Sequence, residues 1–240
     1  MTEYIANMLT KNMYMDGLIK ESEESIYSYS IQLIVEKIIG FSAIYMIALF
    51  QGYFFETVLF TISLSNLRKC TGGYHANSFR SCFIGTVSIY LIYIKLIYPY
   101  LLNNMKINMI IFLVSAMVIF VLGAVNHPGM DWNKEEFEEN KKLARITVFV
   151  ELLVVIALTY LGMAEKYILF MSFGMILCAI LLTLGKITGQ EVKCDEYNIK
   201  KELLSLMQKA VKLEVEKNGN EASRYCPVIL HQPKRPKKLK

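Results

Sequence analysis

Six long apolar runs constrain this 240-residue chain more than any other feature. Several of them approach the roughly 20 residues that a helix needs to cross the hydrocarbon core of a bilayer. Hydrophobic residues make up 54% of the chain, whereas roughly 45–50% is typical of a soluble domain. We therefore expect an all-α polytopic membrane protein with about six transmembrane helices. The runs are 31–50, 53–67, 83–102, 107–125, 146–161 and 167–184.

The two ends of the chain have a different character. Residues 3–15 place apolar side chains at helical spacing, which predicts an N-terminal amphipathic helix on the membrane surface. The first thirty residues mix charges with apolar residues, so they do not form a cleavable signal peptide. The composition changes again after Gly189. We divide the chain into an integral membrane domain (1–190), a linker (191–198) and a tail (199–240).

The tail begins with a second predicted amphipathic helix and ends in a basic segment. Ile199, Leu203, Leu206, Ala210 and Leu213 share one helical face, with lysines on the other. The last ten residues are basic and interrupted by proline, so we expect them to be extended and solvated. From composition alone, the tail is a membrane-surface helix with a lipid-binding basic end.

A short polar break, RKCTGGYHANSFRSC at 68–82, contains the residues that look reactive. Gly72 and Gly73 predict a turn with positive φ. His75 lies on this loop and could act as the base for the thiol of Cys82. Histidine and cysteine close in sequence are also common as a loop residue and a packing residue, so spacing alone leaves both interpretations open.

The residues before Cys82 favour the reactive interpretation. Asn77 or Ser78 is a suitable N-cap for a helix that begins at Phe79. Cys82 would then lie in the first turn, where unpaired N–H groups and the helix dipole favour a thiolate. Further positive potential comes from Arg68, Lys69 and Arg80.

The distribution of lysine and arginine predicts the orientation in the membrane. With six spans, one side receives the N-terminal segment, the polar break, the 126–145 loop and thirteen basic residues from Lys186 onward. The other side receives only Lys106 and Lys166. Both termini and the polar break should therefore be cytoplasmic, where thiols stay reduced.

Other polar residues carry weaker predictions. We expect Glu36, Glu56, Lys95 and Glu151, in or beside the spans, to pair at interfaces or between helices. Gln32 could hold a scissile peptide or be simply interfacial. His127 has no ligand cluster around it and is interpreted as a loop residue. Five cysteines without metal or disulfide spacing, and no nucleotide-binding motif, predict neither a metal, a cofactor nor a nucleic-acid partner.

The polar break resembles the active segment of the accessory gene regulator B peptidases, which process quorum-sensing peptides in low-GC Gram-positive bacteria. An upstream arginine matches Arg68, a Gly-Gly-x-His-Ala loop matches 72–76, and a cysteine follows the histidine at Cys82. Residues 124–133 are similar to the family's proline- and asparagine-containing loop, with Val where many members have Pro-Val. The resemblance implies a membrane cysteine endopeptidase with His75 and Cys82 as catalytic residues, working as a homodimer without a cofactor.

The tail resembles the substrate of that family, the autoinducer propeptide. Such propeptides have an amphipathic leader, a cysteine that starts a five-residue ring, and a charged end; here these are 199–217, 226–230 and 231–240. The resemblance implies cleavage between Leu230 and His231 through a Cys82 thioester, followed by thiolactone formation with Cys226. The partners are then an autoinducer propeptide, which includes the chain's own tail, and the bilayer.

Two non-enzymatic hypotheses compete with this interpretation. A six-span transporter or exporter predicts polar residues along facing spans and an internal repeat, and the sequence has no repeat. A membrane scaffold that binds lipid or a partner through its tail predicts that Cys226 and Leu230 are dispensable.

Overall fold

The computed structural model describes residues 2–76, 78–127, 130 and 132–191. The predictions for the tail therefore lie outside the described residues, including its amphipathic leader and Cys226, Leu230 and His231.

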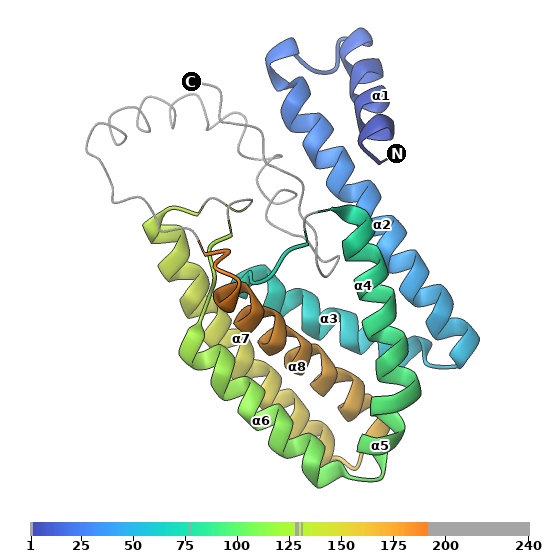
Figure 1. The fold of residues 1–240 in the computed structure, drawn as a ribbon, viewed down its shortest axis with the longest axis vertical. Helices are drawn as coiled ribbons and strands as arrows, with labels where there is room; N and C mark the ends of the chain where they lie inside the picture. Colours follow the sequence, from blue (N-terminus) through green and yellow to red (C-terminus); the bar gives the residue numbers. More distant parts are fainter. Residues whose placement is uncertain (1, 77, 128–129, 131, 192–240) are drawn as a thin grey trace.

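The described part of the chain is a bundle of helices without a strand, which confirms the all-α prediction (Figure 1). A 3-10 turn, η1 (Glu21–Glu23), precedes α2, and a π-helical turn, η2 (Tyr93–Ile97), joins α4 to α5. The helices are α1 (Thr2–Met15), α2 (Glu24–Gln51), α3 (Phe54–Thr71), α4 (Phe79–Ile92), α5 (Tyr98–Leu102), α6 (Met105–Leu122), α7 (Lys134–Tyr160) and α8 (Glu165–Ile187).

Five helical segments of the described chain are long and apolar enough to cross a membrane. They are η1 with α2, α4 through α5, α6, α7 and α8. The second predicted span, 53–67, is the helix α3, but α3 is not among these five. It carries Glu56, Arg68 and Lys69 together with several hydroxyl side chains. The polytopic prediction holds, with α3 as a more polar helix inside the bundle.

Helix α8 lies at the centre of the bundle and packs most extensively against α3 and α6. In Figure 1 it runs between α4 on one side and α6 and α7 on the other. In the most apolar window of α8, 72% of the residues are buried, against 22–33% in the other four spans. Those four expose large apolar side chains, as expected for surfaces that face lipid.

The four charged residues in or beside the spans each have a polar partner, in line with the expected pairing. Glu36 accepts hydrogen bonds from Thr2 and Gln32. Glu56 forms an ion pair with Lys166. The last two pairs also join different helices: Lys95 with Gln51 at 2.7 Å, and Glu151 with Ser63 at 2.8 Å.

Candidate active site

The polar break lies between the end of α3 and the start of α4 (Figure 1), and hydrogen bonds join this region of the chain to segments near the ends of α6 and α8. The loop after α6 is joined to the end of α3, because the N–H of Val125 donates to the carbonyl of Thr71 at 2.8 Å. The break is joined to α8, because the N–H of Tyr74 donates to the carbonyl of Leu181 at 2.8 Å. The loop that carries His75 is thus held from both α6 and α8.

Arg68 stabilises the glycine turn that precedes His75. Its side chain is buried, and its guanidinium donates to the carbonyl of Gly72 and, at 3.0 Å, to that of Tyr74. Gly73 has φ +107°, and a Cβ there would lie 2.7 Å from Arg68 Nη1 and 2.9 Å from the carbonyl oxygen of Leu181. Glycine is therefore required by both conformation and space.

This contact changes the interpretation of the two arginines. The guanidinium of Arg68 donates hydrogen bonds to carbonyls of the turn, so its first role is to stabilise the conformation of the loop. Arg80 lies in the first turn of α4 and is exposed to solvent. Of the two, only Arg80 presents its charge at the surface near the start of α4.

His75 is only 2% exposed and is contacted by two segments distant in sequence. The side chain of Gln190 forms two hydrogen bonds with the His75 backbone. The imidazole ring of His127 lies against that of His75, with ring centroids 4.6 Å apart and planes at 48°. The sequence interpretation assigned His127 to a loop and did not consider Gln190.

Cys82 lies in the first turn of α4, as predicted. Ser78 is the N-cap, and its hydroxyl accepts a hydrogen bond from the N–H of Ser81 at 3.3 Å. Cys82 donates its own N–H to the carbonyl of Ser78 at 3.0 Å. The Cys82 side chain is fully buried, and it belongs to the same hydrophobic cluster as Ala76, the neighbour of His75. The side chains of His75 and Cys82 are therefore both shielded from bulk water.

The loop between α6 and α7 is folded around its own small core. The side chain of Asn126 bonds both the N–H and the carbonyl of Trp132, each at 3.1 Å. Trp132 packs with Ala124, Met130 and Phe137 and is 8% exposed. The indole of Trp132 completes this small core. The fixed loop conformation carries His127 to His75.

Gln32 and the other described cysteines have different environments. Gln32 donates to Glu36 at 2.9 Å, within the contact between α1 and α2. Cys178 is buried within the bundle, with its Sγ 3.3 Å from Thr71 Oγ1. Burial raises the pKa of the Cys70 thiol, which disfavours a thiolate there. Within the described ranges, no group of three or more potential metal ligands occurs.

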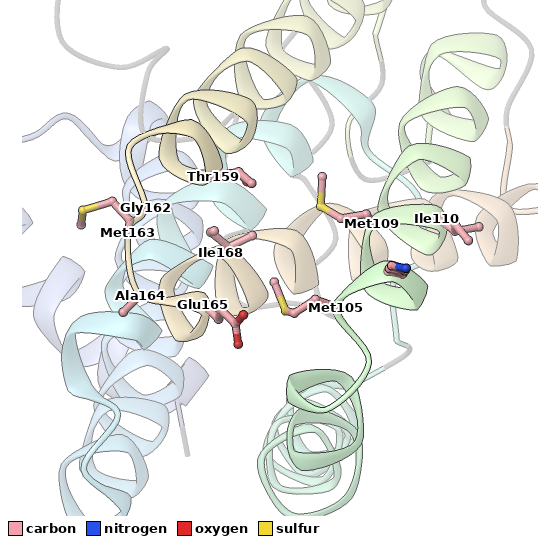
Figure 2. A pocket seen from close by; sticks show the side chains of 10 residues that line it. Met105, Met109, Ile110, Thr159, Gly162, Met163, Ala164, Glu165 and Ile168 are labelled. Atoms are coloured by element: carbon pink, nitrogen blue, oxygen red, sulfur yellow. The ribbon is translucent and has the colours of Figure 1, made fainter.

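A cavity of about 690 Å³ lies at the opposite end of the bundle (Figure 2). Met105, Met109, Met163 and Ile168 give it an apolar lining, with Glu165 at its edge. These residues come from the start of α6, the α7–α8 connection and the start of α8. The cavity is therefore separate from the His75 and Cys82 segment, which lies near the other ends of α6 and α8.

A family model for accessory gene regulator B matches residues 2–182. The chain belongs to the accessory gene regulator B family. This family takes part in the processing of quorum-sensing peptides and acts on an autoinducer propeptide in the membrane. The match includes the whole polar break and ends before Gln190 and the tail. No curated protein and no solved structure matches the chain.

Proposed function

We propose that this protein is a membrane-embedded cysteine endopeptidase that cleaves an autoinducer propeptide, with Cys82 as nucleophile and His75 as base. The observation that carries the proposal is that His75 and Cys82 are both buried and both lie within the residues matched by the family model. The capped helix start at Ser78 supports the choice of Cys82, because it aligns unpaired N–H groups near the thiol.

The reaction proceeds through a thioester. His75 accepts the proton of the Cys82 thiol, and the thiolate attacks the carbonyl carbon of Leu230. The bond between Leu230 and His231 breaks, and the proton passes to the departing amine of the 231–240 segment. The thiol of Cys226 then attacks the thioester, which releases Cys82 and closes a five-residue thiolactone. Acyl transfer between thiols needs neither an oxidant nor a cofactor.

Burial of the site supports transfer to Cys226 over hydrolysis. Cys82 is fully buried and His75 is 2% exposed, so bulk water has little access to a thioester at this position. The substrate thiol is delivered by the peptide itself, whose leader helix binds the same membrane surface. In this chain the tail is covalently attached, which raises its effective concentration further. Cleavage in cis and cleavage in trans within a homodimer both satisfy this chemistry.

We infer a cytoplasmic location for this end of the bundle. The end of α3 carries Arg68 and Lys69, and the first half of α7 carries Lys141 and Arg145, whereas Lys106 and Lys166 lie at the opposite ends of α6 and α8. Positive residues are enriched in cytoplasmic loops. The site and both termini then lie where cellular thiols remain reduced.

The test is the intact mass of the chain after cell-free synthesis into lipid vesicles. We expect loss of residues 231–240 and a remaining chain one water lighter than the hydrolysed product, because the thiolactone retains no added water. In the Cys226→Ala variant, the ring cannot close, and a hydroxylamine-sensitive thioester or the linear product should accumulate. A chain that stays at full length under all conditions would instead favour the scaffold hypothesis.

The ring contact between His127 and His75 leads to a second prediction. His127→Leu should slow cleavage about tenfold, equivalent to about 1.4 kcal/mol, because it removes a ring packed against the base. His127→Phe should retain most of the cleavage rate, since phenylalanine keeps an aromatic ring packed against the imidazole of His75. The measurement is the time course of release of residues 231–240. Equal loss in the Leu and Phe variants would contradict a packing role for His127.

A further inference from the structure

Gln190 is fixed in place by the way in which α8 ends. Gly189 has φ +66° and its N–H donates to the carbonyl of Lys186 at 3.2 Å. The N–H of Gln190 donates to the carbonyl of Gly185 at 3.1 Å. This pair of bonds is typical of a helix that ends at a left-handed glycine. The backbone at Gln190 is therefore fixed by hydrogen bonds to the end of α8.

From that position, the amide of Gln190 pairs with both backbone groups of His75. Its Oε1 accepts the His75 N–H at 2.9 Å, and its Nε2 donates to the His75 carbonyl at 3.0 Å. The side chain of Gln190 thus forms the two hydrogen bonds that a neighbouring β-strand would form. It satisfies both the N–H and the carbonyl of His75. The preceding residue is held in the same way, because Tyr74 N–H donates to Leu181.

We propose that Gln190 is a positioning residue that fixes the backbone of His75 and thereby aims its imidazole at Cys82. The proposal rests on the proposed peptidase function. Fixing both backbone groups restricts φ and ψ at His75, which sets the direction of its Cα–Cβ bond. Gln190 lies beyond the residues matched by the family model and only one residue before the 191–198 linker. The same residue therefore ends the predicted membrane domain (1–190) beside the candidate base.

The test compares Gln190→Met with Thr188→Ala in the full chain, in lipid vesicles. Methionine keeps the length of glutamine without its donor and acceptor. Thr188 lies in the same helix end, but among the described residues its hydroxyl bonds only the carbonyls of Leu184 and Gly185. Gln190→Met should slow release of residues 231–240 about 10- to 100-fold, the range expected when a catalytic group is misplaced by up to about 1 Å. Thr188→Ala should cleave at the wild-type rate.

Two further measurements separate positioning from general stability. The amide of residue 75 should exchange with solvent faster in Gln190→Met, while the melting temperatures of both variants stay close together. The pH–rate profile of Gln190→Met should move to higher pH, because a thiol without its base ionises unaided.

An unchanged exchange rate at residue 75, or an unchanged cleavage rate, in Gln190→Met would overturn the proposal. Failure of the peptidase function itself has a different signature. In that case Cys82→Ala would release residues 231–240 at the same rate as the unmodified chain.

Discussion

Replacement of Cys82 by alanine should stop the release of residues 231–240. We expect the rate to fall at least about 1,000-fold, because the variant has no nucleophile with which to form the thioester. Cys82 is also fully buried in a hydrophobic cluster, where alanine removes one sulfur atom without introducing a polar group. The variant should therefore fold, and a full-length chain should persist in the intact mass spectrum.

The Cys82→Ala result is compared with two other variants, His75→Ala and Cys178→Ala. His75→Ala should reduce cleavage to a similar degree, since the two residues act as one unit and their effects do not add. Cys178→Ala is the matched control, because Cys178 is an equally buried thiol in the same bundle whose Sγ contacts Thr71. It should cleave within about twofold of the unmodified chain. If Cys82→Ala released the segment at the normal rate, the nucleophile would have to be sought elsewhere.

Most of the helical architecture could be predicted from the apolar runs alone. The run 31–50 lies within α2 (Glu24–Gln51), and the run 146–161 lies largely within α7 (Lys134–Tyr160). The helices start before these runs because an apolar run marks only the part of a helix suited to hydrocarbon. Both helices continue beyond it with polar and charged residues, and α7 starts at a capping box formed by Asn133 and Glu136.

The local parts of the site were also predictable, whereas its tertiary contacts were not. The Gly72–Gly73 turn and the Ser78 cap depend on neighbouring residues, so sequence patterns identify them. The contacts of His75 with His127 and Gln190 join segments far apart in the chain. They depend on how α6 and α8 pack. His127 lies in the 124–133 loop that resembles the family's loop, but this similarity does not indicate a contact with His75, and Gln190 belongs to no motif. A glutamine directly after a helix-ending glycine was the only available signal.

The contact between α8 and the His75 loop should also fail when a single methyl group is added at Gly185. A Cβ there would lie 2.7 Å from the N of Tyr74 and 2.8 Å from the carbonyl carbon of Gly73. Both are backbone atoms, so no flexible side chain can move aside. Alanine in place of a helical glycine normally favours the helix by about 1 kcal/mol. Here the loop must retreat, and the bond between Tyr74 and Leu181 should be lost.

We therefore expect Gly185→Ala to slow cleavage about 100-fold, because His75 directly follows the displaced segment. Gly174→Ala is the matched control on the same helix. Its Cβ would lie 2.6 Å from Ser63 Oγ, in the contact between α8 and α3 and away from the loop. Overpacking costs about 1–3 kcal/mol at either position, so both variants should have a lower melting temperature than the unmodified chain. The cleavage rate, measured well below that temperature, should fall only in Gly185→Ala. Equal loss of cleavage in the two variants would mean that the rate follows the stability of the bundle, and that the close approach of α8 to the loop has no separate role in placing His75.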